Sequence, residues 1–302
     1  MRQVLFFAFV AAVVAIYPVH AEIQWHTPAA IAPPTGYNSI PEINLPDYVA
    51  EAIDFAPEEG KPLIAIVIDD MGVDRRRTQE ALEAFPSEVT LAYLPYASDI
   101  AEQVQAARAA GHEIMVHMPM QPQRDTIDPG PNVLHGDLDE AELRRRIDVN
   151  LAAFDGYAGL NNHMGSKFTQ DARGIDILMR EVRKRGLYFL DSRTISNSVA
   201  EQTAAAYGVP VTHRDVFLDD KETEAFTRDA LLKVERTARR KGSAVAIGHP
   251  KDITTRMLAA WIPTLEEKGF QLAPMSAVLK HRRKVSSPRV AAARVIGICE
   301  VH

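Results

Sequence analysis

The sequence predicts an α/β fold in the form of a distorted or incomplete parallel β/α barrel of seven or eight strands. Short apolar segments alternate with segments of helical periodicity, several helical segments end at a glycine, and ionisable residues follow the apolar segments directly. Such alternation implies parallel strands joined by right-handed crossovers. Seven or eight units within about 220 residues suit a closed or nearly closed barrel better than an open sheet.

The expected strands are short apolar runs. The clearest is Leu63–Ile68, which is continuous, branched and typical of a strand buried on both faces of a parallel sheet. Further strands are expected at 88–93, 112–116, 157–161, 187–190, 209–212, 243–247 and 270–272. Helices between them are expected to end at Gly111, Gly186, Gly208, Gly242 and Gly269. Glycine there permits the left-handed turn that returns the chain to the sheet.

Composition limits the classes of protein to which this chain can belong. The chain has 302 residues, of which 46% are hydrophobic and 25% charged, so residues 61–280 can form one domain with a large core. A net charge of −6 argues against nucleic acid as the main partner. The single cysteine, Cys299, excludes an intramolecular disulfide, and it leaves Asp, Glu and His as the ligands for any metal site. No pattern indicates an oligomeric state.

Residues 1–21 have the features of a secretory signal peptide. Arg2 precedes an apolar run of 13 residues, Val4 to Ile16, and Val19 and Ala21 are small residues before a cleavage point at Glu22. Because a membrane span needs about 20 residues, we expect an exported, periplasmic or extracellular protein whose mature chain has no transmembrane span. An uncleaved N-terminal membrane anchor is the alternative.

Two segments flank the predicted domain. Residues 22–60 carry six prolines and predict an extended linker or a strap lying on the domain. Residues 281–302 form a basic tail that we expect to be mobile and solvated, with contact to an anionic surface as the alternative. Its cationic residues are Arg282, Arg283, Lys284, Arg289 and Arg294.

Ionisable residues gather at the ends of the predicted strands. Asp69 and Asp70 directly follow the first strand, where two carboxylates cost desolvation energy unless something compensates them. A metal ion or a reaction would compensate, and the alternative is a pair that caps the next helix. The chain has ten histidines, and four of them follow strands: His117, His163, His213 and His249. In a barrel the carboxyl ends of the strands meet at one face, so we expect these side chains to converge.

The residue types at this face predict metal-assisted hydrolysis of an amide or ester. Carboxylate and imidazole are the ligands of zinc, and Asp70, His117 and His163 supply three ligands with one open position for water. Asp69 can take a proton from that water, and His249 can give a proton to the leaving group. Asp191, behind the fifth strand, can hold His249 in the required tautomer.

Five further residues are candidates for binding a substrate. Asn161 and Asn162 can hydrogen-bond it, although two asparagines at a turn are also common in plain loops. Arg193, Arg214 and Asp215 also follow strands, and for Arg214 and Asp215 an ordinary ion pair is the alternative.

Five motifs together resemble the polysaccharide deacetylase family, most closely its divergent branch, over about residues 60–280: VIDDMG, GHEIMVHMPM, NNHMGSKFT, FLDSRT and AIGHP. The resemblance implies an incomplete β/α barrel that removes acetyl groups from sugar amides or esters. It also implies roles for single residues. Asp69 would be the general base, Asp70 and His117 metal ligands, His249 the general acid, and Asp191 the residue that tunes that acid.

The chain departs from the family pattern at two motifs. Gln121 stands where the family usually has a second metal-binding histidine, and Asn161-Asn162-His163 stands where it usually has an Arg and a Pro. We therefore expect His163 to replace the missing ligand from a neighbouring strand end. Lys167 or Arg193 can substitute for the missing Arg that orients the base.

The leading functional hypothesis is an exported deacetylase that uses a divalent metal, zinc before others, and acts on an acetylated envelope glycan. The alternative is a catalytically weak or inactive glycan-binding or scaffold protein that keeps the metal on the same barrel. A phosphoesterase would favour more basic residues or a second metal. Glycoside cleavage by Asp69 and Asp191 would leave the histidines without a role.

Overall fold

The computed structural model describes residues 51–286. The predicted signal peptide, residues 22–50 of the proline-rich segment and the end of the basic tail lie outside the described residues. Among those described, no helix is both long enough and apolar enough to cross a membrane.

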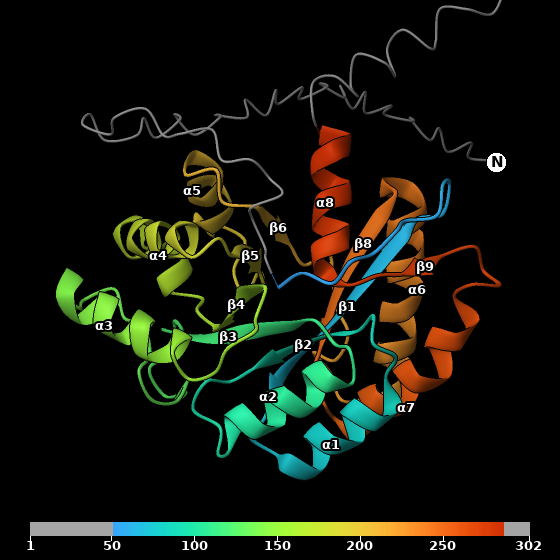
Figure 1. The fold of residues 1–302 in the computed structure, drawn as a ribbon, viewed down its shortest axis with the longest axis horizontal. Coiled ribbons are helices and arrows are strands. Elements are labelled where there is room, and N and C mark those ends of the chain that lie inside the picture. Colours follow the sequence, from blue (N-terminus) through green and yellow to red (C-terminus); the bar gives the residue numbers. More distant parts are fainter. Residues whose placement is uncertain (1–50, 287–302) are drawn as a thin grey trace, which may run out of the picture. The chain divides into compact units, whose positions relative to one another are not determined.

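The centre of the fold is one parallel sheet with the strand order β6-β5-β4-β3-β2-β1-β8-β7, and β9 pairs with the start of β1 (Figure 1). The strands are β1 (Leu63–Met71), β2 (Thr90–Tyr93), β3 (Ile114–Met120), β4 (Gly159–Met164), β5 (Tyr188–Asp191), β6 (Val211–His213), β7 (Val216–Phe217), β8 (Ser243–Gly248) and β9 (Gln271–Leu272). This arrangement confirms the predicted α/β class and the incomplete parallel barrel, because β6 and β7 remain the two edges of the ladder.

Helices connect most successive strands, as the alternating pattern predicts, and one further helix follows the last strand. They are α1 (Arg75–Ala84), α2 (Ile100–Ala109), α3 (Glu140–Leu151), α4 (Ala172–Lys184), α5 (Ala200–Ala206), α6 (Glu224–Lys241), α7 (Asp252–Trp261) and α8 (Met275–Ser286). Two short 3₁₀ turns, η2 (Phe168–Gln170) and η3 (Ile262–Thr264), complete the described elements.

Strand β1 is buried on both faces, which explains its continuous apolar sequence. Residues Leu63–Ile68 have no exposed surface, and all six pair in register with β8, from Leu63 opposite Ser243 to Ile68 opposite Gly248. Alternate side chains point to opposite faces of a strand. Ile64, Ile66 and Ile68 therefore join the larger core shared with the connecting helices, and the other three join a second core.

Helix α8 fills the inner side of the curled sheet. Its residues Met275, Val278 and Leu279 pack in the second core against Leu63 and Val67 of β1. Figure 1 shows α8 between β8 and β6, with the other helices around the outside. A parallel sheet needs cover on both faces, and α8 supplies the inner cover.

Two residues carry the chain across the gap between the edge strands β6 and β7. The backbone N–H of Arg214 donates to the carbonyl of Asp191 at 3.0 Å, and that of Asp215 donates to the carbonyl of Val245 at 2.8 Å. Consecutive residues thus bond to β5 and β8, the strands next to the two edges of the sheet. The barrel is held together at this seam without a strand ladder.

Arg282 of α8 reinforces the same seam. Its guanidinium donates to Thr212 Oγ1 of β6 at 2.8 Å, to Ser243 Oγ of β8 at 3.0 Å, and to the buried carboxylate of Asp215. The prediction that the basic tail begins at residue 281 is therefore wrong, because the helix continues through Ser286. The anchored cation lies against a buried anion and cannot behave as solvated tail.

Residues 51–60 lie against the domain. Phe55 packs on the second core, the N–H of Glu58 donates to Gln271 Oε1 at 2.8 Å, and Glu51 pairs with Arg108 at 2.7 Å. These contacts hold residues 51–60, the described end of the proline-rich segment, against the domain.

Candidate metal centre

A β-bulge in β1 presents the two aspartates to the same space. Ile68 is opposite Leu91 and Met71 is opposite Tyr93, so β1 has one more residue than β2 between these pairs. Asp70 lies in this bulge. Its φ is 57°, in the left-handed region that a non-glycine residue seldom adopts. Bulges and strained residues of this kind occur next to active sites, where they redirect side chains.

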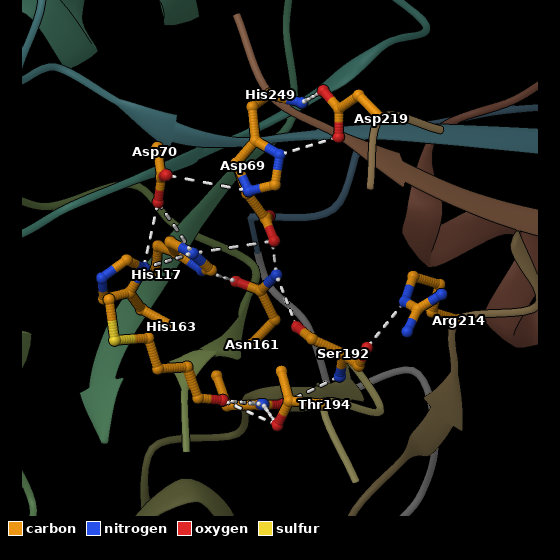
Figure 2. Close-up of polar contacts among 12 residues, drawn as sticks. Asp69, Asp70, His117, Asn161, His163, Ser192, Thr194, Arg214, Asp219 and His249 are labelled. Carbon is orange, nitrogen blue, oxygen red and sulfur yellow. Dashed lines mark hydrogen bonds and ion pairs between the residues drawn. The ribbon is translucent and has the colours of Figure 1, made fainter. Parts of the chain in front are cut away.

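Asp70, His117 and His163 bring three ligand atoms together, as predicted (Figure 2). Oδ1 of Asp70 lies 3.3 Å from His117 Nε2 and 3.0 Å from His163 Nδ1. The two imidazole nitrogens are 3.1 Å apart. Asp70 and His163 lie near the ends of β1 and β4. His117 lies in the middle of β3, because that strand continues past its predicted end at residue 116 to Met120. Pro119 of β3 is in register with His163 of β4.

This geometry fits a divalent metal. Ligand atoms about 2.1 Å from a tetrahedral zinc are separated from one another by about 3.4 Å, close to the distances observed here. Oδ1 of Asp70 is buried and accepts no hydrogen bond of good geometry from the described residues, and a cation between the three atoms would satisfy it. Although burial raises the pKa of Asp70, the two adjacent imidazoles lower it overall, so the ligand carboxylate is ionised at neutral pH.

Asn161 connects the predicted base to a predicted ligand. Its Nδ2 donates to Asp69 Oδ1 at 2.7 Å, and its Oδ1 accepts from His117 Nδ1 at 2.8 Å. Because an amide oxygen can only accept, Nδ1 of His117 carries the ring proton. Nε2 therefore has a free lone pair, which is directed at the site. Asn161 has no exposed surface, so the prediction that it contacts substrate is wrong, and neither Lys167 nor Arg193 makes the bond that orients Asp69.

Asp69 is buried beside the trio rather than within it. One of its oxygens lies 3.6 Å from His117 Nε2, and the other is bonded to Asn161. Burial raises the pKa of Asp69, although the nearby imidazoles and the Asn161 hydrogen bond oppose that rise. A carboxylate with a raised pKa accepts a proton more readily than an ordinary surface aspartate.

His249 lies on the other side of Asp70, with its Nε2 3.7 Å from Asp70 Oδ2. Its Nδ1 donates to Asp219 Oδ1 at 2.9 Å, while Asp219 Oδ2 accepts from the His249 backbone N–H at 2.7 Å and from Thr254 Oγ1 at 2.9 Å. Burial works against the charged ring, but the bond to Asp219 raises the pKa of His249 overall.

Asp219 therefore occupies the role that the sequence assigned to Asp191, and that assignment is wrong. The reason is strand order. Asp219 follows β7, which neighbours β8 and hence His249, whereas Asp191 ends β5 on the far side of the sheet and accepts the backbone N–H of Arg193. The sequence signal that could have pointed to Asp219 is the short apolar run Val216-Phe217-Leu218 directly before it.

The remaining predicted residues, Asn162 and Asp215, make contacts within the protein. Asn162 borders the cavity, but its side chain donates to the carbonyl of Met164 and accepts from the N–H of Ser192, so it braces two loops. Asp215 is bonded to Arg282, Lys241 and the N–H of Val245 away from the site, and its prediction as a substrate contact is wrong. It also forms no ion pair with Arg214, its neighbour in sequence.

Gln121, which stands in place of a histidine ligand, is directed away from the trio. Its side chain accepts from the N–H of Gly136 at 3.2 Å, and its carbonyl accepts from the N–H groups of Lys167 and Phe168. It holds loops on the outer side of the site. His213 likewise lies elsewhere and is bonded to Glu201 at 3.1 Å.

The site opens into a cavity of about 420 Å³. The trio, Asp69 and His249 line this cavity. Its other lining residues include Arg193, Thr194, Arg214, Phe217 and Asp220. A cavity of this size can admit one sugar ring with its substituents.

A family comparison covers the residues of this site. Residues 66–279 match the family described as divergent polysaccharide deacetylase, which spans more than half of the chain. The chain belongs to this family. In this member of the family, His163 of β4 supplies one of the three ligand atoms that meet.

Individual relatives cover the same region. The chain is 35% identical to the uncharacterized protein YibQ of Escherichia coli over 228 residues, which are 75% of this chain and 68% of that protein. It is also 35% identical over 223 residues to an uncharacterized protein of Haemophilus influenzae, covering 74% and 78% of the two chains. The crystal structure of the uncharacterized protein ATU2773 from Agrobacterium tumefaciens matches with a TM-score of 0.71 and 29% identity, over 74% of this chain and 92% of that one.

Proposed function

We propose that this divergent polysaccharide deacetylase is a metal-dependent hydrolase that removes acetyl groups from an envelope glycan. One observation carries the proposal. Three ligand atoms of Asp70, His117 and His163 meet at 3.0 to 3.3 Å, with an oriented carboxylate beside them and an oriented imidazole across from them.

Asp70, His117 and His163 would hold a divalent cation, and we propose zinc because the donors are one carboxylate and two imidazoles. Such an ion, when bound, polarises an acetyl carbonyl and lowers the pKa of water. The orphaned oxygen of Asp70 and the fixed tautomer of His117 support this assignment.

Asp69 acts as the general base in this proposal. The hydrogen bond from Asn161 occupies Oδ1 and leaves Oδ2, the oxygen that faces His117, to accept a proton from the attacking water. Because burial raises the pKa of Asp69, its carboxylate is a stronger base toward this water than that of a surface aspartate.

His249 acts as the general acid. Asp219 holds its Nδ1, so Nε2 carries the proton that passes to the leaving amine of an amide or the leaving oxygen of an ester. Phe217 packs edge-on against the imidazole, with ring centroids 5.4 Å apart, and restricts its rotation.

We also propose that the protein works outside the cytoplasm. The support is the sequence of residues 1–21, which has a basic start, an apolar run and a small-residue cleavage point before Glu22. An envelope glycan is the acetylated polymer available to an exported protein. N-terminal sequencing of the secreted protein tests the cleavage after Ala21.

The function is tested by measuring bound metal and released acetate for the wild type, Asp69→Asn and His163→Ala. The substrates are acetylated chito-oligosaccharides and peptidoglycan fragments. Asp69→Asn should keep the metal and lose turnover, whereas His163→Ala should lose most of both. Asp137→Asn and His135→Ala are matched controls, because both residues lie in the loop before α3, outside the cavity.

A wild type that binds metal tightly but releases no acetate from any of these sugars would contradict the proposal. That result would instead support the reading as a glycan-binding or scaffold protein. Equal loss of turnover in the two control variants would show that the assay reports folding rather than the site.

A further inference from the structure

Arg214 is a cation of the same cavity that the proposed reaction does not use. It lies at the seam between β6 and β7 and borders the space that also contains His249 and Ser192. Figure 2 shows its guanidinium beside Ser192, on a different element from the metal ligands. The side chain is partly buried, so its charge is shielded from bulk water.

Backbone carbonyls and an aromatic ring hold this guanidinium in place. Nε donates to the carbonyl of Ser192 at 2.7 Å, and Nη2 donates to the carbonyl of Arg193 at 2.9 Å. The guanidinium carbon lies 4.8 Å from the centroid of the Phe217 ring, which in turn packs against His249. The cation is therefore oriented before any ligand arrives.

No carboxylate neutralises Arg214 directly. Within residues 51–286, no Asp or Glu oxygen lies within the 4.0 Å ion-pair distance of its guanidinium. The other arginine of the cavity, Arg193, differs, because its Nη2 lies 3.2 Å from Glu201 Oε2. Burial lowers the pKa of Arg214, with Asp69, Asp191 and Asp220, which also lines the cavity, opposing from beyond ion-pair distance, yet a guanidinium stays charged in proteins. A partly buried cation without an ion pair is costly unless an anion joins it.

We propose that Arg214 recognises a carboxylate on the substrate, so that the acetylated sugar is an acid rather than a neutral sugar. This inference rests on the proposed function, because it assigns the substrate class of the same site. Nη1 and the second N–H of Nη2 form no hydrogen bond to a described residue. Together they present an edge of two parallel donors, which matches the two oxygens of a carboxylate.

Two acetamido sugars with a carboxylate serve as probes: N-acetylmuramic acid, whose carboxylate is on a lactyl ether, and 2-acetamido-2-deoxyglucuronic acid, whose carboxylate is that of a uronic acid. The test titrates both acids and their methyl esters into the zinc-loaded full chain. Acid and ester differ in the negative charge of this group and in one methyl group. The titration uses the Asp69→Asn background, so that the sugars are not consumed.

At least one acid should bind 10-fold or more tightly than its ester, and Arg214→Gln should reduce that preference to 2-fold or less. Arg214→Lys keeps the charge but not the paired donors, so it should retain an intermediate preference. Arg228→Gln is the matched control, because Arg228 lies on the exposed side of α6 with 63% of its side chain exposed. Thermal melting of each variant verifies folding.

The two proposals fail differently. Equal binding of acid and ester for both sugars, no binding of either acid, or an undiminished preference in folded Arg214→Gln would overturn the role of Arg214. Acetate release by the wild type would still support the deacetylase in that case. A charge preference that depends on Arg214, without acetate release, would support anion recognition and reject only the deacetylase.

Discussion

Nδ1 of His249 lies 2.9 Å from Oδ1 of Asp219, and Oδ2 of the same carboxylate accepts the backbone N–H of His249 at 2.7 Å. Asp219 thus fixes both the ring and the backbone from which the ring projects. The relationship depends on β7 and β8 being neighbours in the sheet, with Val216 opposite Ala246 and Phe217 opposite Ile247.

Replacing Asp219 by Asn should lower kcat by about 100-fold, because an unoriented general acid loses most of its advantage. KM and bound metal should change little, since Asp219 is not among the three converging ligand residues. Asp191→Asn, which alters a carboxylate bonded to the N–H of Arg193, should reduce kcat only a few-fold. Steady-state kinetics with metal analysis distinguish the two, and a larger effect at Asp191 would contradict the assignment.

Replacing Asn161 by Ala should weaken metal binding by about 10- to 100-fold, as expected when the partner that orients a ligand imidazole is removed. The kcat of the metal-saturated variant should fall as well, because Asp69 loses its 2.7 Å hydrogen bond. Competition with a chromophoric zinc chelator measures the affinity. Asn197→Ala, which removes a surface contact to Gln170, should leave it unchanged.

Removing the metal with a chelator should lower the melting temperature, and adding zinc should restore it. A ligand at 100 times its Kd stabilises the folded state by about 2.7 kcal/mol. His163→Ala should show a much smaller response to zinc, because it lacks one of the three converging ligand atoms. An identical zinc-dependent shift in this variant would mean that the metal binds elsewhere.

The stability of the protein should fall in acid partly through His112. This residue is buried two positions before β3, where its Nδ1 donates to the carbonyl of Val89 at 2.7 Å, and burial lowers its pKa. The ordinary pKa of histidine is about 6.5. Between that value and the lower folded value, the unfolded chain binds more protons than the folded chain, so the free energy of unfolding decreases as the pH falls.

The variant His112→Asn keeps a donor for Val89 without a titrating ring. Urea denaturation from pH 8 to pH 5 should therefore show a shallower loss of stability below about pH 6.5 for His112→Asn than for the wild type. Parallel curves for the two proteins would exclude this contribution from His112.

Replacing Arg282 by Gln should destabilise the barrel by about 2–3 kcal/mol, because the buried carboxylate of Asp215 loses one of its two cationic partners. Urea denaturation at pH 7 measures the change. Arg228→Gln is again the surface control. A loss below about 0.5 kcal/mol, the usual range for a surface substitution, would show that Arg282 does not hold the seam.

Local sequence predicted the elements of the fold well because each has a local cause. The apolar run 63–68 is buried on both faces, and Gly111, Gly186, Gly208, Gly242 and Gly269 all adopt positive φ where helices give way to strands. Helix α8 was not predicted, since the basic residues at its end, such as Arg282, were interpreted as part of a solvated tail. Only the contact with Asp215 makes that charge part of the interior.

The sequence by itself determined the α/β class and the meeting of Asp70, His117 and His163, because parallel strands bring their carboxyl ends to one face. Tertiary structure alone decided that Asp219 rather than Asp191 holds His249, that Asn161 serves Asp69 and His117, and that Arg214 faces the cavity without an ion pair. The reason is that such partnerships depend on which strands are neighbours and where a bulge turns a side chain. Those relationships join residues 30 to 92 positions apart and leave no periodic signal along the chain.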